Sequence, residues 1–230
     1  MLVAGFPAAM FGTNCYVVAT GPGQECLVVD PGIGVGDQLD ELLGEHRLQP
    51  VAVLLTHGHL DHTFSVTPVC GARGIPAYVH SADRYRLVDP MSTLGPQLSE
   101  MFAGRLTWTE PDDVRELIDG STISLAGLDL TVDHAPGHTE GSVLFRTAAA
   151  ADLPPVCLTG DVLFAGSIGR TDQIGGDGAA MQRSLRTKIL PLADETVVLP
   201  GHGPQTTIGQ ERASNPYLRD LAQPPPSRGV

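Results

Sequence analysis

Apolar positions along the first half of the chain alternate between strand-like runs and helical spacing. Two short apolar runs flank the turn Gly21-Pro22-Gly23, as in a strand pair. Leucines at 39, 42, 43 and 48 repeat at the period of a helix, and the unbroken run 51–55 is typical of a buried strand. These patterns predict strand, strand, helix, strand, helix and strand at 15–19, 26–29, 37–47, 51–55, 63–73 and 77–79, with Thr63 as the cap of the second helix.

The second half repeats this order of strands and helices. Its patterns predict strands at 122–125, 128–133, 143–146, 156–159 and 196–199, and a helix at 181–189. We therefore expect two similar α/β halves with their sheets face to face and helices outside. Between the halves, residues 89–111 are irregular; we expect a surface loop with apolar anchors, a lid being the alternative. Residues 1–216 are expected to form one domain, and the proline-rich 217–230 a disordered tail.

Composition narrows the class of protein. Hydrophobic residues make up 42% of the 230, and no apolar run reaches the roughly 18 residues of a membrane-spanning helix, so we expect no membrane partner. The net charge of −12 would repel a nucleic-acid backbone. No Lys or Arg precedes Arg47, which argues against a signal peptide, and the four cysteines form no CxxC pair. A cytoplasmic location is expected; the oligomeric state is left open.

The stretch Thr56-His57-Gly58-His59-Leu60-Asp61-His62 carries the strongest chemical signal. Four candidate metal ligands fall within six residues, directly after the buried strand predicted at 51–55. Imidazole and carboxylate groups suit zinc, iron and manganese. A tight loop cannot direct all four groups at one ion, because a tetrahedral site takes ligands from several directions. The spacing therefore indicates two neighbouring ions, with His57 and His59 facing one, and Asp61 and His62 the other.

Three later strands also run through a small residue or glycine into a candidate ligand. These ligands are His138, Asp161 and His202. Glycine at such a position lets the backbone approach a metal site closely. If the four strand ends converge at one edge, seven ligands would assemble there, and the two oxygens of Asp161 would allow it to bridge both ions.

In these features the chain resembles the metallo-β-lactamase superfamily, and within it most closely the short glyoxalase II-like (hydroxyacylglutathione hydrolase-like) enzymes. The HxHxDH signature at 57–62 carries the resemblance, together with the stretches 13–16, 29–32, 160–172 and 201–204. The resemblance implies an αββα sandwich with two mixed sheets and a dinuclear site, in which zinc is expected and iron or manganese are alternatives. Metal one would take His57, His59 and His138; metal two would take Asp61, His62 and His202; Asp161 would bridge.

The expected reaction is hydrolysis of a thioester by a hydroxide shared between the ions. Metal binding can bring the pKa of water to about 7, and a thiol with a pKa near 8.5 leaves with little acid assistance. Asp61 is both a ligand and the candidate proton acceptor. Full-length glyoxalase II enzymes carry a C-terminal helical domain that supplies much of the glutathione site, and this chain ends soon after His202. The thiol carrier is therefore either glutathione or another low-molecular-weight thiol.

Three residues outside the ligand set are candidates for supporting roles. Arg170 and Asn14 are candidate substrate contacts, and Arg170 alternatively forms an ion pair with Asp172. Asp30, at a strand end, is interpreted as an acceptor that orients a ligand histidine, with a turn residue as the alternative.

Other activities on the same scaffold remain as alternatives. A persulfide dioxygenase would hold a single iron on His57, His138 and Asp161, and that family also carries a Gly-Arg-Thr-Asp segment, as at 169–172. A phosphodiesterase or nuclease is disfavoured by the acidic charge, a non-catalytic metal-binding module by the complete ligand set, and a β-lactamase by the missing export signal.

Overall fold

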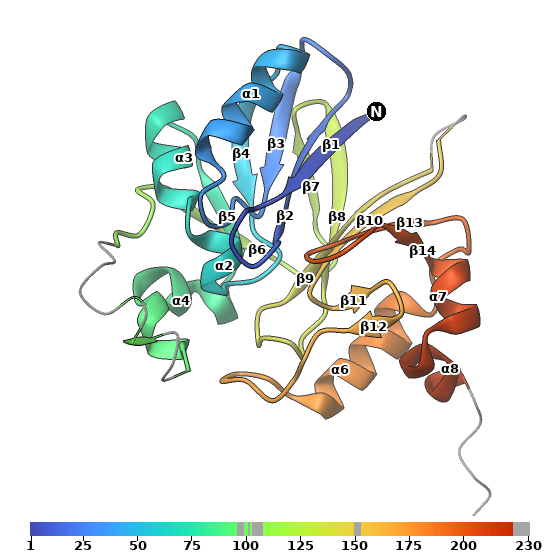
Figure 1. The fold of residues 1–230 in the computed structure, drawn as a ribbon. Helices are drawn as coiled ribbons and strands as arrows, with labels where there is room; N and C mark the ends of the chain where they lie inside the picture. The colour runs from blue at the N-terminus through green and yellow to red at the C-terminus, as the bar shows by residue number, and fades with distance from the viewer. Residues whose placement is uncertain (96–98, 101, 103–107, 150–152, 223–230) are drawn as a thin grey trace, which may run out of the picture.

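Two mixed six-stranded sheets pack face to face in the computed structural model of the chain (Figure 1). The structure describes residues 1–95, 99–100, 102, 108–149 and 153–222. Helices cover the outer face of each sheet, those of the first half on one side and those of the second half on the other (Figure 1). The αββα sandwich predicted from the sequence is therefore confirmed.

The first sheet follows chain order, and its last three strand pairings are parallel. Its strands are β1 Leu2–Pro7, β2 Asn14–Ala19, β3 Glu25–Val29, β4 Gln49–Leu54, β5 Ala77–His80 and β6 Val114–Leu117. The helical segments of this half are α1 Gly36–His46, α2 Leu60–Thr63, α3 Val66–Arg73, η1 Ser81–Asp83, α4 Arg84–Val88 and η2 Pro90–Thr93.

The second sheet has the order β14-β13-β10-β9-β8-β7, and only its β10–β13 pairing is parallel among those the structure describes. Its strands are β7 Thr122–Leu125, β8 Leu128–His134, β9 Val143–Thr147, β10 Val156–Gly160, β13 Val197–Pro200 and β14 Thr206–Thr207. A small hairpin, β11 Leu163–Phe164 with β12 Ser167–Ile168, follows β10. The helical segments are α6 Gly178–Ser184, the π-helical turn η3 Leu185–Ile189, α7 Ile208–Ser214 and α8 Pro216–Ala222.

Three apolar clusters account for the layers. The central cluster lies between the sheets, where Leu27 and Leu54 of the first sheet share it with Leu130 and Phe145 of the second. Separate clusters lie under α1 and α3 on one outer face, and under α6, α7 and α8 on the other. Because each strand alternates its side chains between two buried faces, the central strands read as continuous apolar runs in the sequence.

Two of the predicted element boundaries are wrong. The helix expected over 63–73 is broken into α2 and α3, because Ser65 turns away to donate its backbone N–H to Pro31 O and its hydroxyl to Gly32 O. Thr63 ends α2 instead of capping a helix. The disordered tail expected from residue 217 is helical over its first residues, since α8 buries Leu218 completely against the second sheet's helices.

Other differences are smaller. The helix expected at 181–189 starts three residues earlier, where the Asp177 carboxylate accepts hydrogen bonds from Ala179 N and Ala180 N. The sequence patterns did not indicate β1, β6 or α4. Much of 96–107, within the segment proposed as loop or lid, lies outside the described residues. Among the described ranges, no helix is long and apolar enough to cross a membrane.

Candidate metal centre

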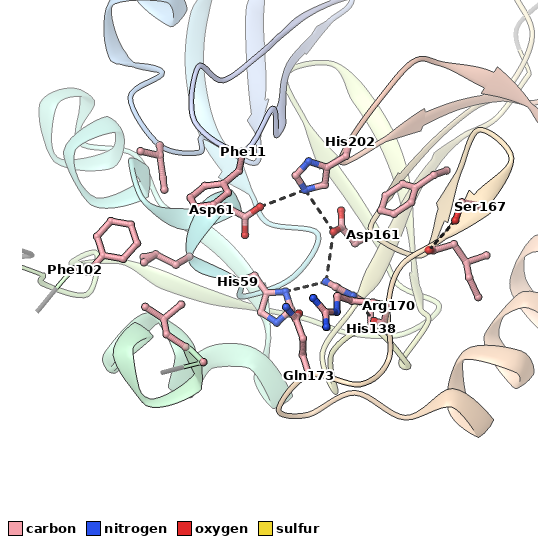
Figure 2. A pocket seen from close by; sticks show the side chains of 16 residues that line it. Phe11, His59, Asp61, Phe102, His138, Asp161, Ser167, Arg170, Gln173 and His202 are labelled. Carbon is pink, nitrogen blue, oxygen red and sulfur yellow. Dashed lines mark hydrogen bonds and ion pairs between the residues drawn. The ribbon is translucent and has the colours of Figure 1, made fainter. Parts of the chain in front are cut away.

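All seven predicted ligands meet at one edge of the sandwich (Figure 2). His57 and His59 follow β4, and Asp61 and His62 lie in α2. The other three follow strand ends of the second sheet, which are β8 for His138, β10 for Asp161 and β13 for His202. The convergence expected from the strand-end pattern is therefore what the fold produces.

The first ligand group consists of His57, His59 and His138, whose ligand atoms lie within 4.8 Å of one another. His138 Nε2 and His59 Nδ1 are 2.8 Å apart. His57 Nε2 is buried and has no hydrogen-bond partner. Buried polar atoms without partners are rare in proteins, so three converging imidazole nitrogens indicate a place for a cation.

The second group consists of Asp61, His62 and His202, again within 4.8 Å of one another. His202 Nε2 lies 3.3 Å from Asp61 Oδ2, and His62 Nε2 lies 3.3 Å from His202 Nε2. Burial lowers the pKa of His62, but the Asp161 and Asp61 carboxylates outweigh burial and raise it. These carboxylates therefore attract positive charge to the point where the second group converges.

Asp161 lies between the two groups. Its Oδ2 is 3.5 Å from His138 Nε2 and 3.6 Å from His202 Nε2, and its Oδ1 is 3.4 Å from His62 Nε2 (Figure 2). Oδ1 is buried and has no hydrogen-bond partner. One carboxylate thus reaches ligands of both groups, as the bridging role requires.

The donor set fits divalent metal ions. Burial, followed by the charge of His138, lowers the pKa of His59 to about 3, and burial also lowers the pKa of His57 and His138. Burial raises the pKa of Asp161, but neighbouring histidines, His62 first, pull it below its usual value. Neutral imidazoles and an ionised carboxylate are the forms that bind metal.

Glycine is required where the strand ends approach each other. A Cβ on Gly201 would lie 2.2 Å from Asp161 Oδ1 and 2.7 Å from His62 Cε1. Any side chain at this position would displace a ligand, which agrees with the close approach predicted for the glycines beside the ligands.

Asp30 orients His62. Its Oδ2 accepts a hydrogen bond from His62 Nδ1 at 3.0 Å, which leaves Nε2 facing the centre. The same carboxylate accepts from Thr56 N and Thr56 Oγ1 at 2.8 and 2.6 Å, and Asp30 is 2% exposed. Fixing the ring through its other nitrogen is how carboxylates set a ligand histidine. This geometry supports the first interpretation of Asp30.

Arg170 contributes in two ways. Its backbone oxygen accepts a hydrogen bond from His138 Nδ1 at 2.8 Å, which directs His138 Nε2 to the centre. Its guanidinium lines the cavity beside the ligands and is paired with exposed Asp172, at 2.7 and 2.9 Å. Both sequence-based interpretations thus have a counterpart, the ion pair being the one formed here.

Asn14 is placed beside the His202 loop and does not line the cavity. Its amide nitrogen donates to Pro200 O and Gly203 O, both at 2.9 Å, and its backbone N–H donates to Gly201 O. Next to it, the Thr13 hydroxyl donates to Asp61 Oδ2 at 2.9 Å. This segment therefore holds two metal-two ligands in place, and the substrate contact predicted for Asn14 has no counterpart in the geometry.

Sequence reasoning missed Asp83, the carboxylate that joins the two ligand loops. Asp83 is fully buried and accepts from Gly58 N at 2.7 Å and from Thr139 Oγ1 at 2.7 Å. Its other oxygen accepts from Gly141 N at 2.9 Å and faces Arg86 Nε at 3.3 Å. Gly58 separates two ligands and Thr139 follows a third. The available signal was its position just after the strand predicted at 77–79, at the same sheet edge.

Comparison with known proteins agrees with this geometry. Residues 9–202 match the family model described as the metallo-beta-lactamase superfamily. An uncharacterized protein of Mycobacterium tuberculosis is 49% identical over 225 residues, covering 97% of this chain and all of that protein. The hydroxyacylglutathione hydrolase GloC of Haemophilus influenzae is 34% identical, covering 92% of this chain and 95% of that protein.

Two solved structures are similar in both fold and sequence. The crystal structure titled BLEG-1 B3 metallo-beta-lactamase has a TM-score of 0.79 and 36% identity, covering 94% of this chain and 99% of that one. The crystal structure of TTHA1623 in a di-iron-bound form has a TM-score of 0.74 and 35% identity, covering 94% of this chain and all of that one. The neighbours therefore share the scaffold while differing in named activity and metal.

Proposed function

Because the chain belongs to the metallo-β-lactamase superfamily, we propose that it is a dinuclear metallohydrolase that cleaves a thioester of a low-molecular-weight thiol. The observation that carries the proposal is the pair of complete ligand groups sharing Asp161, at the floor of a cavity of about 420 Å³. The name of the Haemophilus influenzae relative, a hydroxyacylglutathione hydrolase, supports the thioester. Zinc is the proposed metal, and the di-iron neighbour makes iron the alternative.

His57, His59 and His138 would hold one ion, Asp61, His62 and His202 the other, and Asp161 both. Bound there, the ions would supply a hydroxide nucleophile near neutral pH and a Lewis acid for the carbonyl oxygen. The protein's part is to fix the geometry, through Asp30 behind His62 and the Arg170 carbonyl behind His138.

Asp61 is the proposed proton acceptor. Burial raises its pKa, but His62 and His202 outweigh burial and hold it well below its usual value, so Asp61 is ionised. Its Oδ2 already accepts from Thr13 Oγ1, and the side chain borders the cavity. A thiol leaves as thiolate without strong acid assistance, which suits a cavity lined by carboxylates and neutral imidazoles.

A second candidate function is β-lactam hydrolysis. The structure titled BLEG-1 B3 metallo-beta-lactamase is 36% identical over 94% of this chain, so the same scaffold carries that named activity. Both reactions are attacks of water on an acyl carbon, and the substrate separates them.

Metal counting together with three activity assays tests the proposal. We expect close to two ions per chain in protein purified without chelator, thiol release from acyl thioesters, and loss of that activity after chelation with recovery on adding zinc. Cleavage of a chromogenic cephalosporin without thioester cleavage would support the second candidate. A single iron per chain, with oxygen consumed on a thiol persulfide, would contradict both and identify a persulfide dioxygenase.

The pairing of Arg170 with Asp172 gives a prediction about anionic substrates. Removing the guanidinium in Arg170→Ala should raise KM severalfold for a thioester with a carboxylate and leave the metal content at two. Releasing it in Asp172→Ala should lower KM for the same substrate, because the guanidinium then has both donors free. Steady-state kinetics on carboxylated and neutral thioesters measure both effects. Unchanged KM in both variants would leave Arg170 with a structural role alone.

A further inference from the structure

The cavity above the metal ligands has an apolar wall that the proposed chemistry does not use. Three of the chain's six phenylalanines line it. The apolar lining residues are Phe11, Ile33, Leu60, Leu94, Phe102, Phe164 and Ile168. A hydroxide attacking a thioester carbonyl needs none of these side chains, so the wall serves another part of the substrate.

Phe11 is held on this wall at a conformational cost. Its φ is +62° and that of Gly12 is +67°, so two successive residues occupy the left-handed region. This region is unfavourable for a bulky L residue. The side chain is also 48% exposed, so packing in the core does not repay that cost. Strain of this kind that persists outside the core is found mainly where a ligand is bound.

The loop that carries Phe11 is fixed to the metal ligands. Ala8 N donates to Thr13 O and closes the turn, while Thr13 pairs with His202 across an isolated β-bridge. The Thr13 hydroxyl also donates to Asp61. The ring of Phe11 is thereby placed relative to the reacting centre by two ligands.

The two sides of the centre differ in character. Figure 2 shows Phe11 and Phe102 on the side of Asp61, and Ser167 beyond Asp161. Among the described lining residues, Arg170 is the single Lys or Arg, and it is paired with Asp172. A thioester lying across the ligands has two arms, so one arm would meet the aromatic wall and the other the polar side.

We propose that the substrate carries an apolar group of several carbons on one side of the scissile carbonyl, bound against Phe11 and the neighbouring apolar wall. This inference rests on the proposed thioester hydrolysis and names the substrate class it acts on. The apolar group belongs either to the acyl chain or to the thiol, and the two arms of the experiment separate these sources.

The experiment compares two thioester series on the zinc-loaded enzyme. One series varies the acyl chain of N-acetylcysteamine thioesters from acetyl to octanoyl, and the other varies the alkanethiol of acetyl thioesters from ethyl to hexyl. Burying a methylene improves transition-state binding about threefold, so in one series kcat/KM should rise at least about tenfold over four carbons. The series that rises identifies the half of the substrate that meets the wall.

Variants at the loop provide the controls. Phe11→Ala should lower kcat/KM at least about fivefold for the longest member of that series and leave acetyl-N-acetylcysteamine unchanged, and Phe11→Leu should recover much of the loss. The matched control is Met10→Ala, because Met10 is 42% exposed on the same turn but does not line the cavity. It should behave as wild type.

Two outcomes would overturn the inference in distinguishable ways. Hydrolysis with no dependence on chain length in either series, or an equal loss for short and long substrates in Phe11→Ala, removes the apolar-group proposal and leaves the hydrolase intact. Failure to cleave every thioester in both series contradicts the proposed function, and the inference with it.

Discussion

Asp161→Ala is expected to lose both metal ions and at least about a thousandfold in kcat/KM on any thioester that the wild type cleaves. Removing residues that only orient ligands costs 10- to 100-fold in affinity or activity, and Asp161 should exceed that range because its two oxygens reach ligands of both groups. Its loss also leaves His62 and His202 beside each other with one carboxylate fewer to balance their charge. Elemental analysis and thiol-release kinetics on the same preparation measure both consequences.

The control is Asp129→Ala, which removes an exposed carboxylate of β8 far from the ligands along the strand. It should retain two ions and full activity. An Asp161→Ala protein that keeps two ions per chain would contradict the bridging assignment, whatever its activity.

Asp83→Ala is expected to destabilise the metal-free protein by about 3–5 kcal/mol, the range found when one partner of a buried ion pair is removed. Arg86 is fully buried, and without Asp83 its guanidinium keeps only the Glu140 carboxylate, at 2.7 Å, and the Ile174 carbonyl, at 3.0 Å. Gly58 N and Gly141 N would also lose their acceptor. Because these groups lie in the two ligand loops, metal affinity should fall about 10- to 100-fold as well.

Denaturant unfolding of the metal-free protein and zinc titration with a competing chelator measure the two effects separately. Asp113→Ala is the matched control, since Asp113 pairs with Arg115 at an exposed site where ion pairs contribute little. If Asp83→Ala loses stability but binds zinc as the wild type does, Asp83 stabilises the fold without positioning the ligands. If neither quantity changes, the network is not energetically significant.

The ligand set was predictable from the sequence because each ligand follows an apolar run that can be recognised on its own. His138, Asp161 and His202 are far apart along the chain, yet the rule that strand ends gather at one edge of a sheet brought them together. Asp83 was not predictable in this way, because its role depends on which backbone N–H groups the fold brings to it. Those donors, Gly58 and Gly141, lie 25 and 58 residues away.

The errors in the secondary structure have a similar origin. The break at Ser65 comes from acceptors at Pro31 and Gly32, which no local pattern around residue 65 reveals. The helix α8 depends on burial of Leu218 among α6, α7 and the second sheet, whereas its own sequence neighbours include the prolines that suggested disorder. Local propensity was overridden in both places by contacts distant in sequence.

The bridge between Thr13 and His202 has a consequence for how the protein matures during synthesis. Thr13 and Asn14 leave the ribosome early, and the segment 200–203 that they hold is made 189 residues later. A nascent chain that ends before residue 200 already contains His57, His59 and His138 but lacks the partner that completes the other group. Metal loading therefore has an order imposed by translation: the first position can fill while the chain is still growing, and the second only after nearly all of it has emerged.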